Sequence, residues 1–457
     1  MKNILIIGAG RSATYLIKYL LDKSESEQLF ITIGDLSEAS AQKFIQGHPN
    51  AKGIQLDVFN AAQRRAAIEA ADVVISMLPA RFHIEAAKDC ISYKKHLVTA
   101  SYVSEEMQAL DEAAKANGLV FMNEIGVDPG IDHMSAMQVI DRIRAAGGKM
   151  IMFESFTGGL VAPESDDNLW RYKFTWNPRN VVLAGQGGAA EFIQEGSKKY
   201  IPYHRLFRRT EFLEVEGYGR FEALANRNSL KYRSIYGLED ILTLYRGTMR
   251  RVGFSKAWNM FVQLGLTDDS YTIDQSEDLS YRDFINLFLA YSPTDSVELK
   301  LRHALKIDQD DVMWDKLLEL DIFNRDKKIG LKNASPAQAL QKILEDKWTL
   351  KPEDKDMIVM YHKFGYELDG QKHQIDSKMV LIGEDQTYTA MAATVGLPVA
   401  MVSLMILNKT LTTAGVQRPI HEEVYAPILK ELEGHGIHFK EVEVAYLGYN
   451  PVGGVSG

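Results

Sequence analysis

The sequence predicts an α/β protein built on a doubly wound parallel sheet, and three observations support this prediction. Strand-like apolar runs alternate with amphipathic helical segments over the first 125 residues. The runs are nearly continuous in apolar, β-branched residues, as parallel strands covered on both faces should be. A glycine-rich turn joins the first run to the first helical segment. This βαβ rhythm predicts a parallel sheet with helices on both faces.

The predicted elements follow one another in a clear order. Strand-like runs cover residues 2–7, 29–33, 53–58, 72–77, 96–99 and 119–122, and helices are expected at 16–21, 62–71 and 104–114. A helix over 132–146 ends at a Gly-Gly pair. Further strands are predicted at 150–157, 172–176, 181–183, 211–215, 357–366 and 375–381, and the sequence from 237 to 348 is mostly helical. Within it, Ser335-Pro336 has the chemistry of an N-cap followed by a first helical residue.

Composition limits the class of protein. The chain has 457 residues, of which 25% are charged and 46% hydrophobic, which is typical of a soluble protein with two or three domains. The single cysteine, Cys90, argues against a disulfide framework and a cysteine-based zinc site, and we expect no metal site. A net charge of −9 argues against nucleic-acid binding as the main function.

Residues 387–407 lack charge and could resemble a membrane span. They contain Gly396 and Pro398 among small polar residues, so a buried helix is the better interpretation. The N-terminal apolar run is too short for a signal peptide. We therefore expect no membrane association and a cytoplasmic location.

The turn after the first strand predicts dinucleotide binding. It reads G-x-G-x-x-A, in which the glycines allow a pyrophosphate to reach the N-terminus of the following helix. The candidate cofactor-binding residues of this turn are Gly8, Gly10, Arg11, Ser12 and Ala13. An empty structural turn is the alternative.

An acidic residue at the end of the second strand bears on cofactor choice. A carboxylate there, Asp35, suits the two ribose hydroxyls of NAD and repels a 2′-phosphate, so NAD is favoured. Asp35 could instead act only as a cap of the next helix, and Arg11 leaves NADP open. Asp57 ends the third predicted strand, where it either edges the adenine pocket or lies in a surface loop.

Polar loops follow the next three predicted strands, at residues 78–81, 101–102 and 123–133. The carboxyl ends of parallel strands share one edge of a sheet, so these loops should line one cleft. Candidate acid–base groups are His83, His96, His133 and His362, although a histidine of this kind is more often a packed or surface residue. Glu124 and Asp132 could equally cap backbone amides.

A basic stretch covers residues 198–251, which hold twelve Lys and Arg against six Asp and Glu. Arginine binds carboxylates with two hydrogen bonds, so this excess favours an anionic small-molecule substrate. A solvated or oligomer-facing surface is the alternative, and nucleic acid is a poorer third interpretation because no aromatic stacking platform is evident.

Several motifs resemble the saccharopine dehydrogenase family, in particular its glutamate-forming branch. They are TASYVS (99–104), MNEIGVDPGIDH (122–133), AGGK (146–149), GGLVAPE (158–164), YKFTW (172–176), RGTMR (246–250), HKFG (362–365) and AMAATVGLPVA (390–400). The resemblance implies a Rossmann-type domain over 1–125, to which residues from about 390 to 457 return. It also implies a mixed α/β substrate and dimerisation domain over 126–236 and 349–389, a helical insertion over 237–348, and a homodimer.

The resemblance also implies a reaction of lysine metabolism. Members of this family join glutamate to 2-aminoadipate 6-semialdehyde by imine formation and hydride transfer, or run the reverse, and the three carboxylates of saccharopine suit the basic excess. The implied substrate residues are Ser101, Tyr102, Asp128, Thr175, Arg227, Thr248, Met249 and Arg250. The implied cofactor residues, beyond the glycine turn, are Asp57, Val58, Ile75, Ala100, Ser101, Val127, Asp128 and Pro129.

Two positions depart from the fungal pattern. Thr157 stands where those members have a cysteine, and residues 34–37 lack their arginine, which leaves NADP preference open. For proton transfer the candidates are Asp128 and Tyr102, which could instead only bind substrate, with His133 or a substrate carboxylate moving the proton. The alternative functions are a related lysine 6-dehydrogenase or carboxyspermidine-type dehydrogenase, or a non-catalytic nucleotide-binding regulator.

Overall fold

The computed structural model describes residues 1–448 and divides into two compact units. The first unit is discontinuous in sequence and combines Met1–Lys149 with Met379–Val442. The second unit comprises Met150–Lys378 and the described residues from Glu443 onward.

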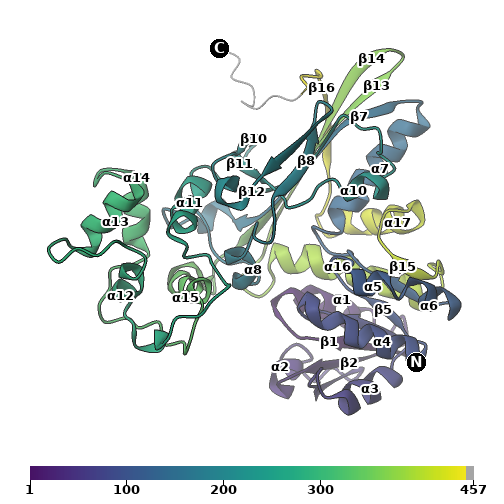
Figure 1. The fold of residues 1–457 in the computed structure, drawn as a ribbon. Helices are drawn as coiled ribbons and strands as arrows, with labels where there is room; N and C mark the ends of the chain where they lie inside the picture. Colours follow the sequence, from purple (N-terminus) through teal and green to yellow (C-terminus); the bar gives the residue numbers. More distant parts are fainter. Residues whose placement is uncertain (449–457) are drawn as a thin grey trace. The chain divides into compact units, whose positions relative to one another are not determined.

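A seven-stranded sheet, parallel at every pairing, forms the centre of the first unit (Figure 1). Its order is β15-β6-β5-β4-β1-β2-β3, and the strands are β1 (Lys2–Ile7), β2 (Leu29–Asp35), β3 (Ala51–Gln55), β4 (Val73–Ser76), β5 (His96–Val98), β6 (Val120–Met122) and β15 (Gly415–Gln417). Buried Ile, Leu and Val side chains fill β1 and β4, as the apolar runs predicted. The predicted doubly wound parallel sheet is therefore confirmed.

Helices cover the sheet of the first unit. They are η1 (Arg11–Ala13), α1 (Thr14–Asp22), α2 (Glu38–Lys43), α3 (Ala61–Glu69), η2 (Ala80–Phe82), α4 (His83–Tyr93), α5 (Glu105–Gln108), α6 (Asp111–Ala116), α7 (Ile131–Ala145), α16 (Ala390–Leu407) and α17 (Glu422–Glu433). Residues 126–149, expected in the second domain, belong to the first unit because α7 packs against α17.

The apolar helix α16 is buried, as predicted. It packs on α1, β4 and β5, and a Cβ at Gly396 would lie 2.7 Å from the backbone nitrogen of Leu16. The two helices thus approach so closely that only glycine fits. Helix α16 is long and apolar enough to cross a membrane by length and composition, but 83% of its apolar window is buried inside the protein.

A mixed sheet organises the second unit. Its order is β10-β11-β12-β7-β13-β14-β16, with β8 paired to β12 and β9. The strands are β7 (Lys149–Val161), β8 (Ala190–Gln194), β9 (Ser197–Ile201), β10 (Glu211–Val215), β11 (Gly219–Ala225), β12 (Thr243–Arg251), β13 (Asp356–Leu368), β14 (Gln371–Ile382) and β16 (Lys440–Val444). Strands β7 and β12 are parallel, whereas β11 runs antiparallel to both β10 and β12.

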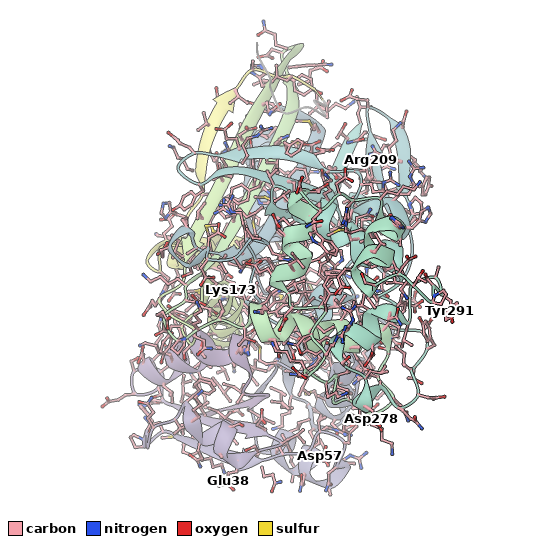
Figure 2. The ribbon with its side chains drawn as sticks, turned by 90° about the vertical axis from the view of Figure 1, so that its left-hand side faces the viewer. Glu38, Asp57, Lys173, Arg209, Asp278 and Tyr291 are labelled. Atoms are coloured by element: carbon pink, nitrogen blue, oxygen red, sulfur yellow. The ribbon has the colours of Figure 1, made fainter. Side chains whose placement is uncertain are left out.

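The helices of the second unit gather mainly in one group after β12 (Figure 1). The second unit contains η3 (Pro163–Ser165), α8 (Pro178–Val182), α9 (Tyr203–Leu206), α10 (Tyr232–Ile235), α11 (Phe254–Leu264), η4 (Ser276–Asp278), α12 (Tyr281–Asn286), α13 (Val297–Leu305), α14 (Val312–Glu319) and α15 (Pro336–Trp348). Edge-on and tilted rings of Trp170, Trp258 and Trp348 join α11 and α15 to the segment before α8. Tyr291, labelled in Figure 2, is 90% exposed between α12 and α13.

Three local predictions differ from the structure. Residues 181–183 were predicted as a strand, but they end α8, because Asn177 caps the helix and Pro178 occupies its first turn. Residues 172–176 form no named strand and make only an isolated bridge from Phe174 to Thr349. The helical insertion belongs to the second unit instead of forming its own. Residues 449–457, part of the predicted return to the first domain, lie outside the described residues.

Candidate active site

The turn after β1 has the geometry needed to bind a dinucleotide. Gly8 has a φ of 101°, and a Cβ there would lie 3.3 Å from the Met77 carbonyl, so the fold itself requires glycine. Gly10 has a φ of −77°, which any residue can adopt, and no atom lies within 4 Å of a Cβ built on it. The fold leaves that space open, and a pyrophosphate that approaches the backbone requires such a space.

The start of the next helix is suited to an anion. Arg11, Ser12 and Ala13 form η1, which leads directly into α1, and no side chain caps either N-terminus. Uncapped amides at a helix N-terminus attract phosphate oxygens. Arg11 is exposed, Ser12 is half-buried and Ala13 lies in the core. The residues of the turn therefore fit a nicotinamide dinucleotide.

Asp35 ends β2 beside this turn. Its carboxylate accepts hydrogen bonds from the backbone amide of Ala9 at 2.9 Å and from that of Ser37 at 3.3 Å. Asp35 thus fastens the glycine turn to the neighbouring strand while placing a negative charge at the carboxyl edge of the sheet. Leu36, the next residue, is 67% exposed.

The other predicted cofactor residues of the sheet differ in accessibility. Asp57, labelled in Figure 2, is half-buried two residues after β3, and its carboxylate accepts the amide of Phe59 at 2.9 Å. Val58 is buried beside it. Ile75 lies within β4 and is fully buried, so its side chain belongs to the core.

The loop after β6 presents one side chain, Asp128. Residues 121–130 are buried with the single exception of Asp128, which is half-buried. The loop closes on itself, because Gly126 donates to the Pro129 carbonyl at 2.8 Å and a Cβ on Gly130 would lie 2.0 Å from the Gly126 carbonyl oxygen. Its Asp128–Pro129 peptide is cis.

Tyr102 meets Asp128 at this edge of the sheet. The Tyr102 hydroxyl donates to the Asp128 carboxylate at 3.2 Å, and Tyr102 is 44% exposed. Ala100 and Ser101 precede it and are half-buried. The structure therefore brings together the two residues that the sequence proposed for proton transfer.

A buried acid, Glu124, anchors the Asp128 loop from behind. Its carboxylate accepts hydrogen bonds from the amide of Val103 at 3.1 Å, from His133 at 2.9 Å and from Arg418 at 3.0 Å. Burial alone would raise the pKa of Glu124, but the hydrogen bond from His133 and the nearby charges of His133 and Arg418 lower this pKa to about 2. Glu124 is thus an ionised structural anchor.

The four histidine candidates occupy different surroundings. His133 is fully buried against Glu124, and His96 accepts the Val120 amide at 3.0 Å. His362 is fully buried between Phe153 and Phe364 in the second unit. His83 lies among hydroxyl groups beside Ser101.

In the second unit, strand β12 carries a row of basic and hydroxyl side chains. Alternation along a strand places Arg246, Thr248 and Arg250 on one face, and Thr157 of β7 lies opposite Thr248. Thr248 donates to the Asn226 amide oxygen at 2.8 Å. Met249 points to the opposite face and is fully buried, so its side chain belongs to the core.

Arg250 is a buried cation without an acidic partner. It is 6% exposed, and its guanidinium lies 5.0 Å from the Tyr172 ring and 5.5 Å from the Phe254 ring. One nitrogen donates to the Met249 carbonyl at 2.9 Å, and Nε has no partner in the described part of the chain. Buried charges normally have a counter-charge, so this one is suited to an anionic ligand.

The segment 172–175 adds a further buried hydroxyl. Thr175 is 2% exposed, and neither its hydroxyl nor that of Thr157 finds a partner among the described residues. The segment is held firmly, because buried Lys173, labelled in Figure 2, bonds Asp167 at 2.8 Å and Asp354 at 2.7 Å. Buried hydroxyls without a hydrogen-bond partner are uncommon, so these two are candidates for hydrogen bonds to a ligand.

The basic excess of residues 198–251 does not form one cluster. Arg227 is exposed in the loop after β11 and forms no ion pair with a described residue. Arg209, labelled in Figure 2, stacks on Phe192 at 5.2 Å, and Arg220 stacks on Phe212 at 5.0 Å. Only some of these cations are therefore available to a substrate.

Three residues of the site escaped the sequence reasoning. Arg418 reaches Glu124 from the end of β15, a strand of three residues, and no local pattern indicated this pairing. Ser76 and Thr99 were not singled out, yet both contact His83. Polar residues at the last position of β4 and directly after β5 were the signal that could have identified them.

Comparisons with known proteins match both parts of the chain. Residues 4–122 match the saccharopine dehydrogenase NADP binding domain, and residues 126–437 match the saccharopine dehydrogenase C-terminal domain. Two similar relatives carry the name saccharopine dehydrogenase [NADP(+), L-glutamate-forming]. The Pyricularia oryzae protein is 32% identical and aligns over 97% of this chain and 99% of its own length, and the Saccharomyces cerevisiae protein is 32% identical over 97% and 100%.

A longer relative and a solved structure agree with these matches. The mitochondrial alpha-aminoadipic semialdehyde synthase of Rattus norvegicus is 32% identical over 96% of this chain, which spans 47% of that protein. The apo saccharopine dehydrogenase (L-Glu forming) of Saccharomyces cerevisiae superposes with a TM-score of 0.87 at 31% identity, covering 97% of this chain and all of that one.

Proposed function

The chain belongs to the saccharopine dehydrogenase family, and from this premise we propose that it interconverts saccharopine with glutamate and 2-aminoadipate 6-semialdehyde. It is an oxidoreductase of lysine metabolism that uses a nicotinamide cofactor. The observation that carries the choice of substrate is the buried guanidinium of Arg250, which forms no ion pair with a described residue and is suited to an anion. Saccharopine supplies three carboxylates.

The first unit holds the cofactor. Gly10 would leave room for the pyrophosphate in the turn that Gly8 allows, the N-terminus of η1 and α1 would attract its charge, and Asp35 would accept a hydrogen bond from the ribose. When bound there, an oxidised nicotinamide would supply the hydride acceptor for the carbon beside the secondary amine of saccharopine. The carboxyl edge of the sheet, where Ser101, Tyr102 and Asp128 lie, is where this chemistry belongs in such folds.

Asp128 and Tyr102 move protons in this proposal. Oxidation and hydrolysis of the C–N bond require a group that takes the amine proton and a group that returns a proton to the departing amine. Asp128 is a carboxylate fixed by a closed loop, and Tyr102 donates to it at 3.2 Å. Asp128 serves as the base, and the Tyr102 hydroxyl orients it and donates to the nitrogen.

The second unit binds carboxylates. Arg250 and Arg227 are cations without an acidic partner in the described chain, and Thr248, Thr157 and Thr175 supply hydroxyl groups. Thr157 carries a hydroxyl, which can donate a hydrogen bond, and has no thiol. Proton transfer through a thiol at this position is therefore not part of the mechanism.

We propose NAD as the preferred cofactor. The curated relatives carry NADP(+) in their names, but in this chain β2 ends at the acidic Asp35, and the apolar, exposed Leu36 follows it. A carboxylate repels a 2′-phosphate, and no cation follows the strand to bind it. The preference follows from these two residues.

A substrate panel tests the proposed function. The protein is given saccharopine, lysine or carboxyspermidine, each with NAD and with NADP, and reduced nicotinamide is measured by absorbance. The expected result is turnover with saccharopine and release of glutamate. Faster turnover with lysine or carboxyspermidine would identify a sibling dehydrogenase, and cofactor binding without any turnover would identify a non-catalytic regulator.

We also propose a homodimer, as the family resemblance implies. Light scattering coupled to gel filtration should give about twice the chain mass of 51.4 kDa. A monomer mass at micromolar concentration would contradict this proposal.

A further inference from the structure

One buried imidazole, that of His83, contacts three hydroxyl groups at the carboxyl edge of the first sheet. Its Nδ1 lies 2.8 Å from the Ser76 hydroxyl, and its Nε2 lies 2.7 Å from the Ser101 hydroxyl and 3.2 Å from the Thr99 hydroxyl. His83 is the first residue of α4 and is 4% exposed. Ser76 and Thr99 are also buried, whereas Ser101 is half-buried and accessible to a ligand.

His83 is not suited to be an acid or a base itself. Both ring nitrogens are occupied by protein hydroxyls, and no described carboxylate pairs with the ring. Burial lowers the pKa of His83 to about 4, so the ring is neutral near pH 7. A neutral imidazole has one donor nitrogen and one acceptor nitrogen.

This restriction couples Ser101 to Ser76. If Ser76 donates to Nδ1, then Nε2 carries the proton and donates to the Ser101 oxygen. The proton of the Ser101 hydroxyl then points away from the ring and is available to a ligand. Thr99 restricts Ser101 further, because its hydroxyl accepts the Ser101 backbone amide at 3.3 Å.

We propose that His83 is a positioning residue that holds the Ser101 side chain in one rotamer and keeps its hydroxyl as a donor to a carboxylate of the substrate. This inference rests on the proposed function, because a substrate carboxylate offers only acceptors to Ser101. Ser76 and Thr99 complete the arrangement from the protein side. His83 touches no reacting atom and acts through Ser101.

Two substitutions with different reach test the position of the imidazole. The amide of Gln in His83→Gln extends to the place of Nε2 and can still donate to Ser101, whereas the shorter amide in His83→Asn reaches only the place of Nδ1. We expect kcat/KM for saccharopine to fall about threefold to tenfold in His83→Asn, the range for one neutral hydrogen bond, and to stay within about twofold of wild type in His83→Gln. If His83 were only structural, kcat/KM would not fall more in His83→Asn than in His83→Gln.

A double-mutant cycle with Ser101→Ala tests whether His83 acts through Ser101. In a positioning role, His83→Asn should cost little once Ser101 is absent, so the double variant should equal Ser101→Ala within about twofold. Equal losses with and without Ser101 would overturn the proposal. The matched control is His96→Asn, which removes a half-buried imidazole at the start of β5 that accepts the Val120 amide and does not contact Ser101. This variant should leave kcat/KM unchanged.

Melting temperatures accompany every variant. If His83→Asn does not fold, the cycle is measured with His83→Gln and His83→Leu. The supporting result is then a difference in kcat/KM between these two variants that disappears in the Ser101→Ala background. Persistence of that difference would overturn the proposal. No turnover of saccharopine by the wild type would instead refute the proposed function, and with it the ligand assigned to Ser101.

Discussion

Replacing Arg250 with methionine should weaken substrate binding without weakening the fold. The guanidinium is buried, makes one hydrogen bond to a carbonyl at 2.9 Å and has no acidic partner among residues 1–448. A buried charge that lacks a counter-charge is costly, and an apolar side chain of similar volume often replaces it at no net cost. Methionine is unbranched and can fill the space between the rings of Tyr172 and Phe254.

The substitution should change the melting temperature little and raise KM for saccharopine strongly. Loss of the contacts with two aromatic rings costs about 1–2 kcal/mol, and relief of the unpaired charge offsets it, so the melting temperature should stay within a few degrees. A charge-assisted hydrogen bond to a carboxylate is worth about 1.5–3 kcal/mol, so KM for saccharopine should rise about 10- to 150-fold.

Arg251 provides the matched control for this experiment. It is the next residue of β12, so it points to the opposite face, where it stacks on Phe221 at 4.5 Å and donates to the Tyr218 carbonyl at 2.7 Å. Arg251→Met should leave KM for saccharopine unchanged. KM is measured from nicotinamide absorbance, and cofactor affinity from the fluorescence of the reduced nucleotide.

A specific result would refute the reasoning about Arg250. If Arg250→Met folds and its KM stays within threefold of wild type, the buried guanidinium does not bind a substrate carboxylate. A large loss of melting temperature together with unchanged KM would show that its role is structural.

Three further sets of substitutions test the cofactor preference, the proton transfer and the stability in acid. Leu36→Arg and Asp35→Asn should each raise the NADP-to-NAD ratio of kcat/KM about tenfold, or about 1.4 kcal/mol, and the asparagine keeps a neutral acceptor for the Ala9 amide. A wild-type protein that already prefers NADP tenfold would contradict the role given to the carboxylate. Asp128→Asn should remove the acidic limb of the kcat–pH profile, and Tyr102→Phe should reduce kcat at least tenfold; retention of the wild-type profile and a tenth of the rate by both would assign the proton elsewhere. Folding lowers the pKa of Glu124 from 4.5 to about 2, so its contribution to the free energy of unfolding, roughly 3 kcal/mol, is present above pH 4.5 and is lost between pH 4.5 and 2. Glu124→Gln should therefore reduce the loss of stability over this pH range in an acid-unfolding series. An unchanged slope would show that Glu124 is not the group responsible.

Patterns along short stretches of sequence were enough to predict the first sheet and its turn. The apolar runs correspond to β1 to β6, and the glycines at 8 and 10 follow β1 as expected. The Ser335-Pro336 pair begins α15, where Ser335 and Gln338 form a capping box. These features depend on neighbours within about four residues, so they are visible in a sequence.

Features that depend on distant partners were not visible. The run at 181–183 is apolar and suits a strand or a helix, and the Asn177 cap decides for the helix. The bond between Glu124 and Arg418 joins positions 294 residues apart. Similarly, the sequence identified His83 as a candidate, but only the fold shows that the ring is enclosed by hydroxyls and unable to titrate near neutrality.

The discontinuity of the first unit has a consequence for how the chain is made. Helix α1, which starts at the glycine turn, packs on α16, and β15 extends the sheet beside β6, yet both partners are synthesised only after residues 150–378. While the ribosome makes that long insert, the apolar side of α1 has no cover, and closing so distant a contact is slow. A fragment that ends before residue 390 would keep every residue of the glycine turn and still leave Leu16 exposed. The cofactor-binding half of this enzyme is therefore completed late in biosynthesis and cannot be isolated by a single truncation.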